Sequence, residues 1–263
     1  MSESGAPIKT ELAHDGGVLR VVLDQPKGNV LSTAMMQAIG AALDAHRDDK
    51  KLKLVTLRGA GGHFSFGASV PEHKKEAARG MLATFHRFVR SVASYPVPIA
   101  ALVSGRCLGG AFELVLACHY VFATDTALFG CPEVKLGVLP PVLAVIGHHR
   151  LGAPLAERLV TTGAELSARE AEARGLVASL VPPDVDLDAW IDGWYEASLA
   201  PLSAFSLREA TYAARHGSGL LESLGAPLDA AERRYVERLL PSHDGNEGIE
   251  AFLAKRSPQW VNE

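Results

Sequence analysis

The sequence predicts an α/β protein made of repeated strand-strand-helix units, followed by a C-terminal region that is almost entirely helical. Short apolar runs rich in β-branched residues, such as residues 53–59 and 99–103, alternate with longer segments whose apolar residues recur at helical spacing. The strand-strand-helix order returns at related intervals, which favours coiled ββα units over a doubly wound sheet. From Leu187 onward the pattern changes to one helix after another.

The N-terminal part of the chain begins with a predicted hairpin. Residues 8–12 and 18–23 form two apolar or alternating runs around a glycine-containing turn. A proline and a glycine end the second strand, and Ser32 or Thr33 is suited to cap the helix predicted over residues 35–46.

A glycine-rich loop, GAGGHFSFGASVPEH, occupies residues 59–73 and precedes a helix predicted over residues 74–93. The loop contains too much glycine for regular structure and is too long for a simple connection. Long loops in compact domains often carry function. We therefore include this loop in the candidate site.

The stretch over residues 104–133 has the pattern of an active site. Gly109 and Gly110 come directly before the helical segment AFELVLAC. The first N–H groups of a helix lack intrahelical partners and attract negative charge, and glycine lets a ligand or another backbone approach closely. Glu113 lies in this apolar helix start, where a carboxylate is unfavourable unless it is paired or functional, and Glu133 follows a proline further on.

Beyond the second carboxylate the chain enters a loop that ends at Pro140 and Pro141. The second proline suits the first turn of the helix that follows. A further helix and strand are predicted over residues 167–181. We divide the chain into a core of residues 1–195 and a helical region of residues 196–263, whose apolar stripes must pack on the core or on another subunit.

Composition fits an ordinary soluble globular protein of 263 residues, with 48% hydrophobic and 21% charged residues. The net charge of −4 gives no reason to expect a nucleic acid partner, and no basic run indicates an anionic membrane. No leader-like or membrane-spanning pattern is present, and Cys107, Cys118 and Cys131 lack the spacing of a zinc site. We expect a cytoplasmic protein with reduced, buried thiols.

With these motifs in order, the chain resembles the crotonase family, the enoyl-CoA hydratases and isomerases, along nearly its whole length. The resemblance implies a crotonase-like spiral with a C-terminal helical oligomerisation region that forms homotrimers or homohexamers. It also implies an oxyanion hole for a thioester carbonyl, made by the N–H groups of Gly110 and of Ala68 in FSFGAS. Glu113 and Glu133 fall on the two catalytic glutamates of the hydratases. The resemblance assigns water activation to Glu113 and proton exchange at substrate carbon to Glu133, with shared or exchanged roles as the alternative.

The same resemblance implies a binding site for coenzyme A, which the substrate carries, so no separate cofactor is expected. Phe252 and Lys255 match positions that contact adenine and phosphate from a neighbouring subunit. Lys27 is a weaker candidate. An ordinary terminal helix with solvated Lys255 and Arg256 is the alternative interpretation of the same residues.

Other chemistries find less support in the sequence. His148 and His149 stand together, but no third ligand accompanies them, so a solvated helix face is expected and no metal site. The glycine-rich stretch lacks the pattern of a phosphate-binding P-loop, a dinucleotide-binding loop or a serine nucleophile elbow.

Two departures from the common hydratase pattern bear on the substrate. Ser69 stands where most hydratases carry aspartate, and residues 140–145 read PPVLAV where they carry a glycine-rich stretch. We expect this segment to form a stiff apolar wall of the acyl pocket. The combination is most similar to the hydratases of cyclohexa-1,5-diene-1-carbonyl-CoA. Hydration of cyclohex-1-ene-carbonyl-CoA or linear enoyl-CoA, thioester hydrolysis, and non-catalytic binding, including RNA binding, are the alternatives.

Overall fold

In the computed structural model, which describes residues 6–182 and 184–263, the strands form two sheets. The larger sheet has the order β1-β2-β3-β4-β6-β9 and the smaller one β5-β7-β8. The strands are β1 (Ile8–Ala13), β2 (Val18–Leu23), β3 (Leu54–Gly59), β4 (Ile99–Val103), β5 (Arg106–Leu108), β6 (Tyr120–Thr124), β7 (Leu128–Gly130), β8 (Glu165–Ser167) and β9 (Ser179–Val181). The first five residues of the predicted core and Pro183 lie outside the described residues.

Helices connect these strands and form the whole C-terminal part. They are α1 (Thr33–His46), α2 (Lys75–Ala93), α3 (Gly110–Ala117), α4 (Pro141–Leu151), α5 (Ala153–Thr162), α6 (Ala168–Ala173), α7 (Leu187–Ser198), α8 (Ala204–Gly217), α9 (Leu220–Ser223), α10 (Ala226–Arg234) and α11 (Asp244–Leu253). Short 3-10 segments are η1 (His14–Gly16), η2 (Val70–His73) and η3 (Pro132–Leu136), and η4 (Tyr235–Leu239) is a π-helical turn. Within the described ranges, no helix is long and apolar enough to cross a membrane.

The predicted spiral of ββα units is confirmed. One turn consists of β4, β5 and α3, and the next consists of β6, β7 and α4. Strands β3, β4 and β6 pair in parallel in the larger sheet, β5 and β7 pair in parallel in the smaller one, and α3 packs between α2 and α4. In the turn that contains α2, an isolated bridge from Ser65 to Cys107 takes the place of the second strand.

Local sequence signals account for the element boundaries. The hairpin of β1 and β2 forms as predicted, with η1 at its turn. The hydroxyl of Ser32 accepts the N–H of Met35 at 3.3 Å, so Ser32 is the cap of α1. Helix α4 begins at Pro141, where a missing N–H removes no helical hydrogen bond.

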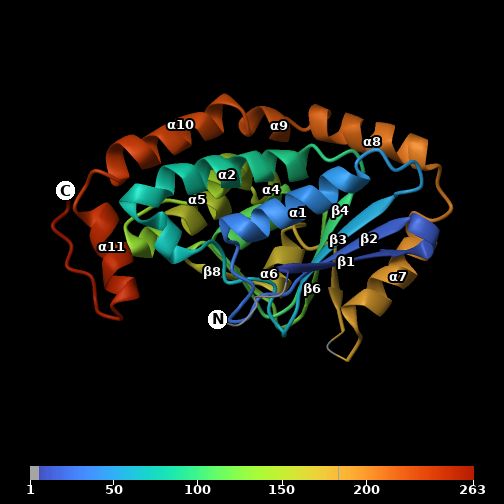
Figure 1. Cartoon of the computed structure of the whole chain (residues 1–263), viewed down its shortest axis with the longest axis horizontal. Helices are drawn as coiled ribbons and strands as arrows, with labels where there is room; N and C mark the ends of the chain where they lie inside the picture. The colour runs from blue at the N-terminus through green and yellow to red at the C-terminus, as the bar shows by residue number, and fades with distance from the viewer. Residues whose placement is uncertain (1–5, 183) are drawn as a thin grey trace.

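Both faces of the larger sheet are covered, which explains its nearly continuous apolar strands. In β4, Ile99 and Ala101 belong to the main core beneath α1, α2 and α3, whereas Ala100 and Leu102 belong to a second core beneath α7. Figure 1 shows α1 and α2 on one side of this sheet and α7 on the other. Because α7 spans residues 187–198, a domain boundary at residue 195 would divide this helix, and that division remains a prediction.

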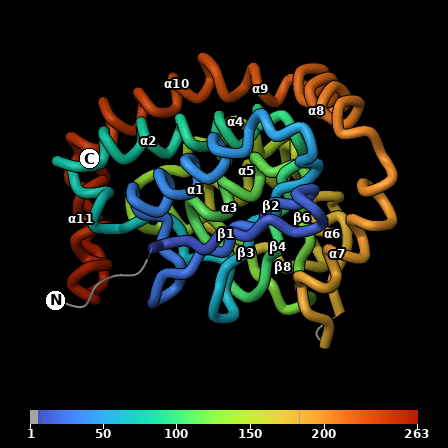
Figure 2. Tube along the Cα trace, turned by 45° about the vertical axis from the view of Figure 1, so that its right-hand side comes forward, coloured from blue at the N-terminus to red at the C-terminus, as the bar shows by residue number. Residues whose placement is uncertain are grey.

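The last helices run along one side of the molecule in series from α8 through α9 to α10, and α11 turns away at the end (Figures 1 and 2). Two polar contacts join α10 to α2, a hydrogen bond of 2.6 Å between the buried His86 ring and the Glu232 carboxylate and an ion pair between Arg90 and Asp229. Helix α11 packs against η2 and η3, which carry site residues. The C-terminal region therefore covers the core of its own chain.

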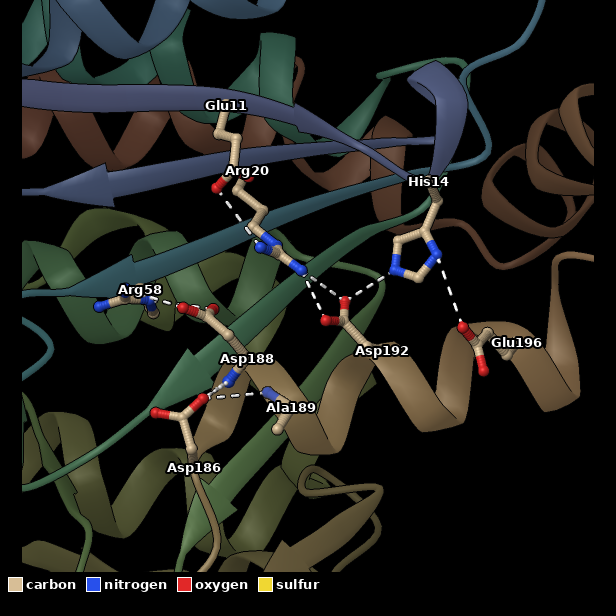
Figure 3. A network of polar contacts seen from close by, with 9 residues as sticks. All are labelled: Glu11, His14, Arg20, Arg58, Asp186, Asp188, Ala189, Asp192 and Glu196. Carbon is tan, nitrogen blue, oxygen red and sulfur yellow. Dashed lines mark hydrogen bonds and ion pairs between the residues drawn. The ribbon is translucent and has the colours of Figure 1, made fainter.

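A polar network fixes α7 to the strands it covers (Figure 3). The Asp192 carboxylate accepts two hydrogen bonds from Arg20 on β2, at 2.7 and 2.6 Å, and lies 2.9 Å from the His14 ring. Arg58 on β3 pairs with Asp188 in the same way. Asp186 caps the helix by accepting the N–H groups of Asp188 and Ala189. Partly buried bidentate pairs of this kind are stronger than exposed ones.

We expect Asp192→Asn to lower the free energy of unfolding by about 1–3 kcal/mol, because Arg20 and His14 lose their shared carboxylate in a partly buried setting. Urea denaturation measures the loss. Asp125→Asn is the matched control, since Asp125 pairs with a largely exposed Arg169 and should change stability by less than about 1 kcal/mol. Equal losses in the two variants would contradict a structural role for the network.

Candidate active site

Two backbone N–H groups lie next to each other between the long loop and the start of α3. A Cβ placed on Gly110 would lie 3.5 Å from the Cβ of Ala68, so the two backbones are in contact distance. Neither N–H donates a backbone hydrogen bond within the described part of the chain. The predicted oxyanion residues Gly110 and Ala68 are thus brought together with free donors.

Close backbone packing at this point requires glycine at two positions. A Cβ on Gly67 would come within 2.4 Å of the Leu108 carbonyl oxygen. A Cβ on Gly109 would come within 2.8 Å of Glu133 Oε1, and Gly109 also has a positive φ of 54°. The glycines therefore let the two loops and the Glu133 carboxyl meet at one place.

Glu113 projects from the first turn of α3 and is 3% exposed. Its Oε1 accepts the N–H of Val142 at 2.7 Å and that of Leu143 at 2.9 Å. These are among the first N–H groups of α4, where the helix dipole also favours negative charge. The start of α4 therefore stabilises the ionised form of Glu113.

Glu133 lies on η3 and is 8% exposed. Its Oε2 is sealed from solvent and has no hydrogen-bond partner among the described residues. A charge on such an oxygen is unfavourable, so this environment favours the protonated carboxyl.

The two carboxyl groups influence each other as well. Burial raises the pKa of Glu133, and the charge of Glu113 raises it further. Burial also raises the pKa of Glu113, but the N–H groups of Leu143 and Val142 oppose that rise. The pKa of each carboxyl is thus raised overall, and because only Glu113 receives the helix N–H groups, a proton shared by the pair favours Glu133 over Glu113. This arrangement provides a base and an acid side by side.

A cavity of about 870 Å³ opens beside this pair, and both Ala68 and Glu133 line it. Its polar and charged lining residues are Ser69, His73, Glu133, Lys135 and Arg256. The remaining lining residues are apolar or glycine: Val30, Phe66, Ala68, Val70, Pro71, Leu108, Gly109, Pro132, Leu136, Val138, Gly248, Phe252, Leu253 and Pro258. A mostly apolar cavity with few polar groups is typical of a small-molecule site.

The residues proposed for coenzyme A are only partly assembled around this cavity. Phe252 on α11 lines the cavity of its own chain and is 54% exposed, and its predicted contact with coenzyme A across a subunit boundary stays a prediction. Lys255 and Lys27 are exposed and are absent from the lining. Arg256 lines the cavity instead, held by the Glu247 carboxylate at 2.5 and 2.7 Å. Sequence reasoning treated Arg256 only as a solvated residue, although it adjoins Lys255.

The structure corrects the expectation that residues 140–145 form a wall of the acyl pocket. None of these residues lines the cavity, and Pro140, Pro141, Val142 and Leu143 are buried. Two of these residues, Val142 and Leu143, donate their backbone N–H groups to the Glu113 carboxylate. The apolar wall is made by other side chains, among them Val30, Phe66 and Val138.

Tyr235 is a residue near the pair that sequence reasoning missed. It begins the π-helical turn η4, is 1% exposed, and has no hydrogen-bond partner for its hydroxyl among the described residues. Burial raises its pKa, and the charges of Glu133 and Glu113 add to the rise. In the sequence it looks like any aromatic residue of an amphipathic helix, so only its tertiary position reveals it.

The remaining predictions concern histidines and cysteines. His148 and His149 are exposed, as expected for a solvated helix face, and the three cysteines are buried and unpaired as predicted. In the ranges that the structure describes, no group of three or more histidine, cysteine, aspartate or glutamate side chains could hold a metal ion.

The raised pKa of Glu133 predicts how Glu133→Gln alters stability with pH. A carboxyl whose pKa is raised by folding destabilises the folded state as pH rises through that value, because the unfolded chain releases the proton more readily. The variant should differ little from the native protein at pH 5 and be more stable by on the order of 1–3 kcal/mol at pH 9. Urea denaturation at both pH values measures this. Glu157→Gln on the exposed side of α5 is the control, and a pH-independent difference for Glu133→Gln would refute the assignment.

Comparison with known proteins agrees with the motifs. The sequence profile of the enoyl-CoA hydratase/isomerase family matches residues 13–263. A cyclohexa-1,5-dienecarbonyl-CoA hydratase of Thauera aromatica is 40% identical over 262 residues, and the match covers 100% of each chain. A probable enoyl-CoA hydratase of Rhizobium meliloti is 34% identical, and the match covers 93% of this chain and 95% of the relative. The structure of an enoyl-CoA hydratase from Mycobacterium avium matches with a TM-score of 0.84 at 28% identity, covering 98% of this chain and 100% of that one. The chain therefore belongs to the crotonase family, as its sequence predicted, and is an enzyme of the hydro-lyase class.

Proposed function

We propose that this protein adds water to an α,β-unsaturated acyl-CoA thioester, with cyclohexa-1,5-diene-1-carbonyl-CoA as its substrate. The observation that carries the proposal is the buried glutamate pair, in which Glu113 is stabilised as a base and Glu133 as an acid. Addition of water to a conjugated double bond needs both functions at once. A thioester hydrolase or a binding protein gives no reason to keep both carboxyls in these environments.

The residues divide the reaction between them. Glu113 takes a proton from water, and the resulting oxygen nucleophile bonds to the β-carbon of the substrate. The electron pair of the double bond moves toward the thioester carbonyl oxygen, where the N–H groups of Ala68 and Gly110 stabilise the negative charge. Glu133 then gives its proton to a carbon atom of the resulting enolate, which completes the addition of water. Loss of one oxyanion donor typically weakens transition-state stabilisation by roughly 3–4 kcal/mol, so the two donors make a large contribution.

The cyclic substrate is supported by the cavity and by the relative from Thauera aromatica, whose name specifies this diene. Val30, Phe66 and Val138 contribute apolar side chains to the lining of the cavity. A rigid ring loses little conformational freedom on binding, whereas ordering a flexible chain costs about 0.5–1.5 kcal/mol per immobilised group. No cofactor is needed beyond the coenzyme A of the substrate, because hydration transfers no electrons.

We expect the purified protein to hydrate cyclohexa-1,5-diene-1-carbonyl-CoA with a kcat/KM roughly 10- to 200-fold above that for crotonyl-CoA, the range that shape discrimination in an apolar pocket provides. Cyclohex-1-ene-carbonyl-CoA should fall between them. The measurement follows loss of the conjugated thioester absorbance for the three substrates. Faster hydration of crotonyl-CoA than of either ring would refute the cyclic substrate but leave the hydratase activity standing.

Glutamate variants complete the same experiment. Glu113→Gln and Glu133→Gln should each lower kcat by orders of magnitude, and the double variant should lose little more than the worse single one, because groups that act as a unit are non-additive. Near-native hydration by Glu133→Gln would contradict the acid role. Free coenzyme A released at a comparable rate by the native protein would favour thioester hydrolysis instead.

We also propose assembly into homotrimers or homohexamers in the cytoplasm. Leu202, Phe205 and Tyr212, in and just before α8, are 46%, 74% and 61% exposed, and exposed apolar clusters of this kind often mark protein interfaces. Phe205→Ser should lower the mass measured by sedimentation velocity, while Val134→Ser, at an exposed position on η3, should not. A trimer or hexamer mass unchanged by Phe205→Ser would exclude α8 as the contact.

A further inference from the structure

His73 is the histidine that lines the cavity beside Ala68 and Glu133. It ends η2, directly before α2, and its ring nitrogen Nδ1 lies 2.9 Å from the backbone carbonyl oxygen of Ser69. Ser69 follows Ala68, so the ring is tied to the residue next to an oxyanion donor. The imidazole is therefore held close to the place that a thioester carbonyl would occupy.

This hydrogen bond determines which nitrogen carries the proton. A carbonyl oxygen only accepts hydrogen bonds, so Nδ1 of His73 must be the donor. Burial lowers the pKa of His73, which favours the neutral ring. In a neutral imidazole with a proton on Nδ1, Nε2 carries a lone pair and can only accept.

The accepting nitrogen is available to a ligand. Nε2 of His73 is neither hydrogen bonded to a described residue nor sealed from solvent. Because the ring lines the cavity, this nitrogen, which is open to solvent, is available to a ligand that binds there. Much of the surrounding lining, including Val70 and Val138, is apolar and offers no competing donor.

We propose that His73 Nε2 accepts a hydrogen bond from the hydroxyl group of the hydrated acyl chain or ring, and thereby recognises the hydroxyacyl thioester. This inference rests on the proposed hydratase function. Coenzyme A itself also carries hydroxyl and amide donors along its pantetheine arm. The acyl hydroxyl is favoured over these donors because His73 is hydrogen bonded to Ser69, the neighbour of the proposed oxyanion donor Ala68. The acyl hydroxyl is on the β-carbon, which is only two bonds from the thioester carbonyl carbon.

Binding measurements test this without turnover. Isothermal titration compares 2-hydroxycyclohexanecarbonyl-CoA with cyclohexanecarbonyl-CoA, which lacks only the hydroxyl, in protein that carries Glu133→Gln to prevent dehydration. Adding His73→Leu should weaken binding of the hydroxylated ligand roughly 5- to 10-fold and leave the other ligand nearly unchanged, as expected for one neutral hydrogen bond. His73→Gln keeps an acceptor and should give an intermediate loss.

Comparing the two ligands separates the acyl hydroxyl from the donors of the pantetheine arm. Any disturbance of Ala68 through Ser69 affects both thioesters and cancels in the ratio of their Kd values. Equal weakening of both ligands leaves the ratio unchanged and would overturn the proposal, because the loss would then not come from the acyl hydroxyl. His148→Leu, on the exposed face of α4, controls for loss of an imidazole and should leave the ratio unchanged. None of these titrations requires catalysis, so the result for His73 can be distinguished from a failure of the proposed hydratase activity.

Discussion

The hydrogen bonds from the start of α4 to Glu113 are the constraint on which the site depends. A buried carboxylate is strongly unfavourable unless several donors meet it, and here Val142 and Leu143 supply two N–H groups. Pro141 has no N–H to offer, so the first donors of the helix are those that reach Glu113. The direction of α4, and with it the packing of α3 against α4, is therefore linked to the charge of one side chain.

The same constraint explains why two identical side chains have different electrostatic environments. Glu113 has helix donors, whereas the Oε2 atom of Glu133 has no donor among the described residues and lies near the charge of Glu113. Each protonation state thus follows from the neighbourhood and not from the residue type. Gly109 completes the arrangement, since a Cβ there would come within 2.8 Å of Glu133 Oε1 and displace that carboxyl.

Sequence patterns predicted the local structure well and the cavity only in part. The hairpin, the cap at Ser32, the helix start at Pro141 and the meeting of Ala68 with Gly110 could be anticipated, because periodicity, capping chemistry and paired motifs are local or shared signals. The position of the segment that begins at Pro140 could not be anticipated, because the sequence does not show whether a stiff apolar stretch faces a ligand or the core. His73 and Arg256 were missed for the same reason, since their role depends on which side of a loop faces the cavity.

The C-terminal region contributes to the site through its attachment to the core. The hydrogen bond between His86 and Glu232 holds α10 on α2, and Tyr235 follows one turn later, where the helix widens into a π-helical turn. Such turns often accompany functional sites because they rotate the following side chains relative to a regular helix. Beyond it, α11 places Phe252 and Arg256 on the cavity. This part of the cavity wall comes from the same chain, whereas a contribution from a neighbouring subunit and the proposed contact through α8 stay predictions.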